Sequence, residues 1–167
     1  METYLKQFKN PMASSAAFLA ILPLLSATPS DAATPSPKKP KASCRIEIDN
    51  AHISTSLLKN LKVKYVKVNA RSICNVPQQR VTLTVEIHKI GVLGNHFVDS
   101  HFTNPSDPRS SGFRVENQST KALCISSKVT KYFGIAYAKA FILGKWQYAG
   151  RTQSPKVVPL RCGTSTK

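Results

Sequence analysis

The sequence predicts an all-β domain: an antiparallel β-sandwich with an immunoglobulin-like Greek key, stapled by two disulfides. Three observations favour this fold class. Apolar residues recur with period two rather than 3.6, and turn-forming residues separate seven or eight short alternating segments. Four cysteines occur in the 167 residues without a C-x-x-C pair. A small β-barrel is the alternative architecture.

Residues 1–32 predict a signal peptide. Lys6 and Lys9 precede an apolar stretch over residues 12–25, and small residues follow it. Signal peptidase requires small side chains at positions −3 and −1, so we expect cleavage after Ala32 or, alternatively, after Ala27. The apolar run is shorter than the ~20 residues of a membrane span. We therefore expect a secreted, extracellular protein.

The mature chain is expected to consist of a tether, one domain and a short tail. Residues 33–43 are rich in proline and lysine, which predicts an extended and solvated tether. The β-sandwich domain is expected over residues 44–163, and residues 164–167 form the C-terminal tail. The chain carries 24 Lys and Arg against 8 Asp and Glu, a formal net charge of +16. The signal peptide contains as many basic as acidic residues, so the whole excess belongs to the mature protein.

The strands are predicted from their alternation. In residues 81–88 the apolar side chains fall on one face and polar ones on the other, which is the clearest strand of the chain. Residues 61–70 alternate as well, and their phase slips at Val66, which predicts a β-bulge. Residues 132–143 carry Gly134 and three alanines on one face, which would let another strand approach closely. Shorter strands are expected over residues 44–48, 96–102, 113–115, 145–148 and 156–162. No stretch has a helical stripe, so we expect no helix.

The four cysteines predict two disulfides, because an exported chain of this size meets an oxidising environment. Three pairings are open. Paired residues of an antiparallel hairpin have a constant sum, and the midpoints of Cys44–Cys74 and Cys124–Cys162 fall at turn-forming residues. We therefore favour these two pairs, each of which would contribute on the order of 3–4 kcal/mol by closing its loop.

The sequence contains no motif of a nucleotide-binding site, a metalloprotease or a serine hydrolase. The mature domain has only six acidic residues, so we expect no pair of carboxylates for acid–base catalysis. We expect no enzyme activity, no catalytic residue and no cofactor. His96, Asp99 and His101 form the one cluster with metal-ligand chemistry, but His96 and His101 are five residues apart and point to opposite faces of a strand. We therefore expect no metal site.

The positive charge predicts a polyanionic partner. A strand over residues 61–70 would place Lys62 and Lys64 on one face, within a basic stripe. Excess positive charge attracts extracellular polyanions or an anionic envelope surface without specific contacts. No nucleic-acid-binding motif is present, so specific nucleic-acid recognition is not expected. The candidate contact residues are Lys59, Lys62, Lys64, Lys67 and Arg71.

Two further features are candidates for contacts. Trp146 and Tyr148 share one face of an extended segment, where they would stack on sugar rings, insert at a membrane interface or pack on the edge of the sandwich. The alternative function is a secreted effector, toxin or inhibitor that binds a protein partner through the loops over residues 91–95 and 103–112.

Several segments together carry a family resemblance: residues 68–74 ending in Cys74, the strand 81–87, residues 122–124, residues 132–136, and residues 154–162. In this order they resemble small secreted proteins of actinobacteria, most of them uncharacterised. The resemblance implies a disulfide-stapled β-sandwich. It implies no established activity and no catalytic residues.

Overall fold

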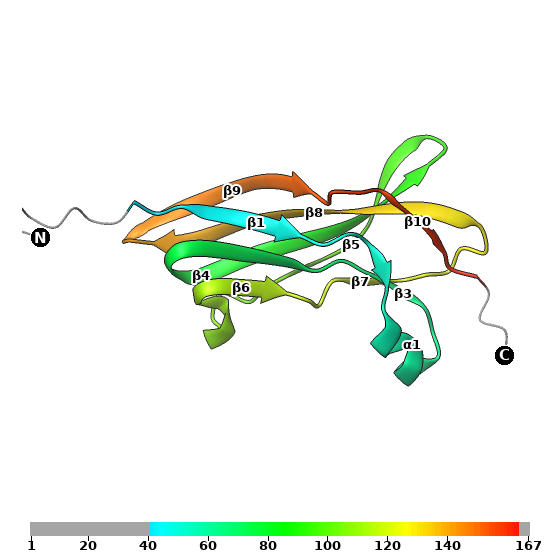
Figure 1. Ribbon diagram of the computed structural model, residues 1–167, viewed down its shortest axis with the longest axis horizontal. Helices are drawn as coiled ribbons and strands as arrows, with labels where there is room; N and C mark the ends of the chain where they lie inside the picture. Colours follow the sequence, from blue (N-terminus) through cyan, green and yellow to red (C-terminus); the bar gives the residue numbers. More distant parts are fainter. Residues whose placement is uncertain (1–40, 164–167) are drawn as a thin grey trace, which may run out of the picture. The chain divides into compact units, whose positions relative to one another are not determined.

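The computed structural model describes residues 41–163; the predicted signal peptide, residues 33–40 of the tether and the tail 164–167 lie outside the described residues. The described part is mostly antiparallel β-sheet with one α-helix and a short 3-10 helix (Figure 1). Neither helix is both long and apolar enough to cross a membrane. The elements in chain order are β1 (Cys44–Ile48), β2 (His52–Ile53), α1 (Thr55–Leu61), β3 (Tyr65–Lys67), β4 (Ala70–Gly91), β5 (Gly94–Phe102), η1 (Pro108–Ser110), β6 (Gly112–Asn117), β7 (Lys121–Leu123), β8 (Val129–Ile142), β9 (Lys145–Gln153) and β10 (Val158–Arg161).

The 22-residue strand β4 organises the sheet. Its first half pairs with β1 and β6, and its second half pairs with β5 and β8, which in turn pairs with β9 and β10. Between the halves the register shifts and Arg80 has a left-handed backbone, φ 50°. At this place β4 turns back over itself in Figure 1. Strands β2, β3 and β7 form a separate three-stranded sheet.

One hydrophobic core lies between the strands that pair with the first half of β4 and those that pair with its second half. Val81, Leu83, Val85 and Ile87 are 0% exposed, as the alternation predicts. Residues of β1, β3, β6 and the first half of β4 belong to the same buried cluster. The face of β8 with the small residues also points into this core, since Ala136, Ala138 and Ala140 are buried.

Gly134 permits the closest approach in this core. A Cβ atom at this position would lie 2.5 Å from Cγ1 of Val68 and 2.9 Å from Cδ1 of Ile48, which is closer than real Cβ contacts. The predicted close approach of another strand to β8 is therefore confirmed, and its partners come from β1 and the segment after β3.

The predicted strand over residues 61–70 is wrong in its first half. Ser54 caps helix α1 by accepting a hydrogen bond from the main-chain N–H of Leu57 at 3.4 Å, and the helix ends at Lys62 in the left-handed conformation. Strand β3 begins only at Tyr65. No β-bulge occurs at Val66, because β3 pairs with β2 and β7 in unbroken register. The first half of the alternation belongs to the helix end and the loop after it. The seven-residue helix buries no residue, so it has no apolar stripe that the sequence could reveal.

Both disulfides have the favoured pairing. Cys44 and Cys74 lie directly opposite each other on β1 and β4, as the hairpin argument predicts. Cys124 and Cys162 are not opposite residues of neighbouring strands, because one follows β7 and the other follows β10. The hairpin argument is therefore wrong for the second pair, although the pairing itself is confirmed.

Strand β1 has the predicted bounds, and the other remaining strands are confirmed with shifted bounds. The short strands β2 and β7 and the part of β4 over residues 71–80 were not expected. The end of the tether is part of the domain, because Asn75 holds it on β4. The side chain of Asn75 donates to the carbonyl oxygen of Lys41 at 3.0 Å and accepts from the N–H of Ser43 at 2.8 Å. Of the eleven residues predicted as a solvated tether, the last three are therefore held against the sheet.

Candidate functional site

Arginines and lysines have different surroundings in this fold. Among the described residues, five of the six carboxylates pair with an arginine. The sixth, Asp99, accepts a hydrogen bond from the N–H of Ser100. Since arginines neutralise most of the acidic residues, the positive excess is carried mainly by lysines. The paired carboxylates are Glu47, Asp49, Glu86, Asp107 and Glu116.

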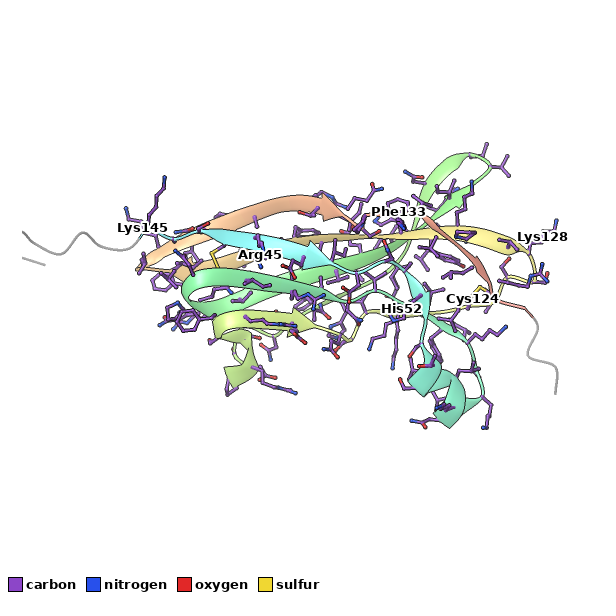
Figure 2. The ribbon with its side chains drawn as sticks, in the orientation of Figure 1. Arg45, His52, Cys124, Lys128, Phe133 and Lys145 are labelled. Atoms are coloured by element: carbon purple, nitrogen blue, oxygen red, sulfur yellow. A yellow bond between two sulfur atoms is a disulfide. The ribbon has the colours of Figure 1, made fainter. Side chains whose placement is uncertain are left out.

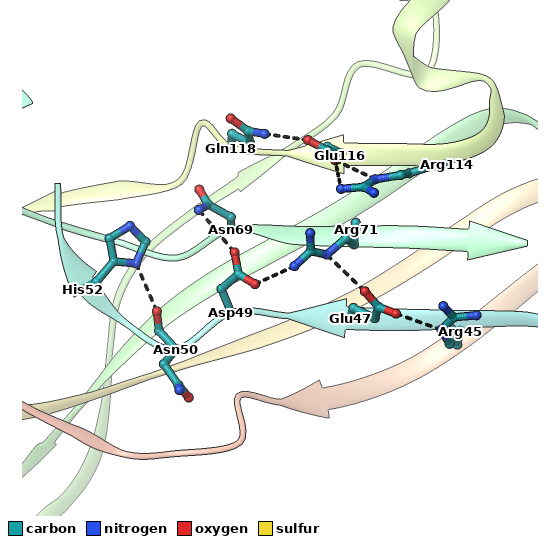
Figure 3. A network of polar contacts seen from close by, with 10 residues as sticks. All are labelled: Arg45, Glu47, Asp49, Asn50, His52, Asn69, Arg71, Arg114, Glu116 and Gln118. Carbon is teal, nitrogen blue, oxygen red and sulfur yellow. Dashed lines mark hydrogen bonds and ion pairs between the residues drawn. The ribbon is translucent and has the colours of Figure 1, made fainter. Parts of the chain in front are cut away.

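Arg71 belongs to this neutralised group. Its guanidinium lies 3.2 Å from Glu47 and 2.8 Å from Asp49, in a network on the outer face of β1, β4 and β6 (Figure 3). Arg45 also pairs with Glu47, at 2.9 Å. On the neighbouring strand, hydrogen bonds from Gln118 and Arg114 hold the pKa of Glu116 below its usual value. The structure thus separates Arg71 from the other predicted polyanion contacts.

Basic residues without acidic residues among them occur in four segments, residues 55–67, 88–97, 121–131 and 158–163, which we call the lysine-rich end. These segments contain nine basic and no acidic residues, whereas the other described residues contain ten basic and six acidic ones. In Figure 1 the segments lie toward the right, with α1, the β4–β5 hairpin, the loop before β8 and the end of β10. The nine basic residues are Lys59, Lys62, Lys64, Lys67, Lys89, Lys121, Lys128, Lys131 and Arg161.

Specific contacts join these segments. The N–H of Cys124 donates to the carbonyl oxygen of Lys64 at 3.0 Å, and the disulfide links Cys124 to Cys162. Arg161 of β10 lies opposite Val129, the first residue of β8. Figure 2 places Lys128 and Cys124 at this end and Lys145 at the opposite one. A disulfide, a main-chain hydrogen bond and the pairing of β8 with β10 therefore join three of the four segments.

Two lysines and one histidine form a row across the small sheet of β2, β3 and β7. His52 of β2 lies opposite Lys67 of β3, and Lys67 lies opposite Lys121 of β7. Directly opposite residues share one face of a sheet. Because the adjacent Val66 and Ala122 are buried, the row of His52, Lys67 and Lys121 lies on the outer face. We call these three residues the lysine row. Like charges in such positions repel each other, so the row is a place where an anion would be stabilising.

The other predicted lysines belong to helix α1 and the residues that follow it, at the same end of the domain. Lys59 lies on α1, and Lys62 is the helix C-cap. The Nζ atom of Lys64 reaches toward Gly163, where it would lie 3.3 Å from an added Cβ. The prediction that Lys62 and Lys64 share a strand face is wrong, because neither lies in a strand.

The contributions of Lys121, Lys128 and Lys131 were not predicted. They come from a different part of the chain, and the pairing of β3 with β7, the pairing of β4 with β8 and the second disulfide bring them to this end. The one signal in the sequence is the absence of acidic residues from all four segments.

Exposed apolar side chains accumulate at the lysine-rich end as well. Among the described residues, eight of the fourteen exposed large apolar side chains belong to it. Val92 is fully exposed, Leu93 is 92% exposed and Ile125 is 82% exposed. This end therefore combines cations with apolar groups, a composition typical of surfaces that bind at a polar–apolar interface.

Trp146 and Tyr148 lie on β9, one and three residues after Lys145, which Figure 2 places at the opposite end of the domain. The ring of Trp146 packs edge-on against Phe141 at 5.6 Å, and the Nζ atom of Lys139 lies 5.5 Å from its centre. Tyr148 is 76% exposed. The structure therefore does not bring this aromatic pair together with the predicted lysines.

A hollow of about 920 Å³ lies between the loop after β5 and strand β6. Both of its carboxylates are bound: Asp107 by Arg109 at 2.8 Å, and Glu116 by Arg114. The hydrogen bonds from Arg109 hold the pKa of Asp107 below its usual value. Within residues 41–163 no three His, Cys, Asp or Glu side chains are placed to bind one metal ion.

Glu86 is a buried carboxylate on the outer face of β4. Burial would raise its pKa, but the hydrogen bond from His88 at 2.8 Å, the charge of Arg151 and a hydrogen bond from Tyr137 outweigh this effect and lower it. Glu86 also accepts a hydrogen bond from Arg151, which lies over the ring of Tyr137. This cluster ties β4 to β8 and β9, and we assign it to stability.

Comparison of the chain with protein-family models, curated proteins and solved structures finds no match.

Proposed function

We propose that this protein is secreted and binds anionic surfaces or polymers outside the cell through its lysine-rich end, without catalysing a reaction. The observation that carries the proposal is the segregation of charge: nine basic and no acidic residues in four segments that meet at one end. Such a concentration of one sign attracts polyanions over a distance and gains free energy by releasing their counterions.

The lysine row gives the proposal a local centre. Lys67 lies between His52 and Lys121, and no acidic residue occurs in β2, β3 or β7. A phosphate, sulfate or carboxylate group placed over the row would accept charge-assisted hydrogen bonds from both ammonium groups and would reduce their repulsion. Lys121 also lies 5.8 Å from the centre of the Tyr65 ring, so an aromatic surface borders the row.

Secretion is supported by the predicted signal peptide and is compatible with two disulfides. The strand orders β1-β4-β6 and β5-β4-β8-β9 support an immunoglobulin-like Greek key as the finer description of the fold. The resemblance to small secreted proteins of actinobacteria agrees with both proposals.

Retention of the oxidised mature protein on immobilised dextran sulfate, across a salt series, tests the proposal. The variant Lys67→Gln with Lys121→Gln should elute at clearly lower salt than the unmodified protein. The matched control, Lys145→Gln with Lys139→Gln, removes the same charge outside the lysine-rich end and should elute close to the unmodified protein. No retention at low salt, or an equal loss in both double variants, would contradict a localised anion-binding end.

One observation favours the alternative, a secreted effector, toxin or inhibitor that binds a protein: the apolar tip of the β4–β5 hairpin, Val92 and Leu93, is almost fully exposed. In that case binding should persist at high salt and depend on the tip rather than on the lysine row. The two functions are therefore distinguished by salt dependence.

A further inference from the structure

The β4–β5 hairpin ends in an apolar tip. Val92 and Leu93 form its two-residue turn between Gly91 and Gly94, which are paired. Gly94 has φ 115°, so this glycine absorbs the unusual backbone conformation that closes the turn. Two-residue hairpin turns favour Asn, Asp and Gly. Two apolar side chains in fully exposed turn positions contribute nothing to the core and face water at a cost in free energy.

Two lysine residues lie on the strands close to this tip. Lys89 of β4 lies opposite His96 of β5, and Lys131 of β8 lies opposite Ile90. A strand rises about 3.4 Å per residue, so the backbone of Lys89 lies about 10 Å behind that of Val92. This spacing is comparable with the depth of about 5–10 Å to which interfacial protein segments enter a bilayer.

The loop before β8 repeats the combination. Ile125 is 82% exposed and follows Cys124, which the disulfide to Cys162 anchors. Lys128 comes three residues later, and the exposed Val129 begins β8. Each of the two projections thus presents apolar side chains close to lysines, with no acidic residue in either segment.

We infer that the anionic surface is a phospholipid bilayer, and that the hairpin tip inserts Val92 and Leu93 at the boundary between headgroups and acyl chains. This inference rests on the proposed function. A soluble polyanion would satisfy the lysines but would offer no apolar phase to the tip. A bilayer with anionic lipids offers both: phosphates for Lys89 and Lys131, and hydrocarbon for the two tip residues.

Vesicle flotation tests the inference. The oxidised mature protein should float with vesicles of three parts phosphatidylcholine to one part phosphatidylglycerol and bind weakly to vesicles of phosphatidylcholine alone. The variant Val92→Ser with Leu93→Ser should bind the mixed vesicles about tenfold or more weakly. It should keep its retention on dextran sulfate. Because both side chains are exposed, the variant should fold normally. Tyr148→Ser removes a similarly exposed side chain at the other end and should bind like the unmodified protein.

A fluorescence experiment locates the inserted residues. Leu93→Trp in a Trp146→Phe background places the only tryptophan at the tip. Its emission should shift to the blue on mixed vesicles and be quenched by brominated acyl chains. The unmodified protein is the control, because Trp146 lies near the opposite end and its emission should not respond.

The outcomes separate the two proposals. If the tip double variant floats like the unmodified protein and the introduced tryptophan does not respond, insertion is overturned while polyanion binding stands. If the protein binds dextran sulfate but no vesicle, the bilayer is overturned as the partner. If it binds neither, the proposed function falls as well. Equal flotation with both kinds of vesicle would overturn the role of the anionic lipid.

Discussion

Replacement of Lys67 by glutamine is expected to change stability and binding in opposite directions. Lys67 occupies the middle of the lysine row, with His52 on one side and Lys121 on the other. Glutamine keeps most of the length of the side chain and its capacity to hydrogen-bond, and it removes the charge. The variant therefore tests whether repulsion within the row lowers the stability of the free protein while the same charges strengthen the binding of an anionic partner.

The expected change in stability follows from the register of β2, β3 and β7, which places these side chains directly opposite one another. Cβ atoms of directly opposite residues are about 4.5–5.5 Å apart, and pair interactions at this distance amount to about 0.2–1 kcal/mol. Because Lys121 is exposed and Lys67 partly so, we expect the free energy of unfolding of Lys67→Gln to rise by about 0.5 kcal/mol at low salt. A lysine near an anionic membrane contributes about 1 kcal/mol to binding, so the affinity for mixed vesicles should fall about fivefold.

Urea unfolding of the oxidised mature protein measures the first effect, and vesicle flotation measures the second. A double-mutant cycle of Lys67→Gln with Lys121→Gln should give a repulsive coupling that disappears as salt rises from about 0.05 M to about 1 M. Lys145→Gln is the matched control, since Lys145 begins β9 outside the lysine-rich end. It should change neither quantity appreciably.

Two results would refute this reasoning. Loss of stability in Lys67→Gln, or a coupling energy that salt does not change, would show that the two lysines do not repel each other. Unchanged vesicle affinity together with the expected stabilisation would show that the row is repulsive but lies outside the interface.

Three further predictions concern the fold. Gly134→Ala should lower the free energy of unfolding by about 1–3 kcal/mol, because its methyl group would collide with Val68 and Ile48; an unchanged urea midpoint would contradict the packing described. Asn117→Ala should cost about 2–3 kcal/mol, since this buried amide donates to two main-chain carbonyl oxygens at 3.0 and 2.8 Å; a loss below about 0.5 kcal/mol would argue against these bonds. The lowered pKa of Glu86 means that the unfolded chain binds the proton more readily, so the stabilisation from this group is present above its ordinary pKa of 4.5 and is lost as pH falls through the lowered value. Urea unfolding as a function of pH should show this loss, and Glu86→Gln should make the profile flatter in that window.

The alternation of apolar and polar residues predicted the strands that bury one face in the core. The apolar face of β4 from Val81 to Ile87 and the small-residue face of β8 both point into the core. In these strands one face is buried and the other is not, so the sequence carries a period of two. The first half of β4 alternates in burial as well, but Ser72 and Gln78 place polar side chains at two of its buried positions, so its sequence lacks a clear apolar period. The register shifts and left-handed Arg80 then interrupt the strand at its turn.

The features that do not bury a face could not be predicted in this way. Helix α1 has no buried residue, so its sequence has no apolar stripe from which it could be predicted. The Cys124–Cys162 pair was predicted correctly from an argument that does not apply to it, because these cysteines lie outside the paired strands.

The lysine-rich end was predicted only in part. Lys59, Lys62, Lys64 and Lys67 belong to it, but Arg71 pairs with carboxylates that come from more than 20 residues earlier in the chain. In the register of β1 with β4, Arg71 lies opposite Glu47. The predicted Cys44–Cys74 pair implies this register, so the neutralisation of Arg71 could have been predicted. The lysine row could not, because it requires the pairing of three separate strands.

The decisive measurement is the binding of the oxidised mature protein to vesicles with and without phosphatidylglycerol. It compares two double variants, Lys67→Gln with Lys121→Gln and Lys145→Gln with Lys139→Gln. Binding should require the anionic lipid, decline with salt and fall about thirtyfold in the first double variant, while the second should stay within about twofold of the unmodified protein. Equal affinities of the two double variants would contradict a lysine-rich end that binds anionic surfaces.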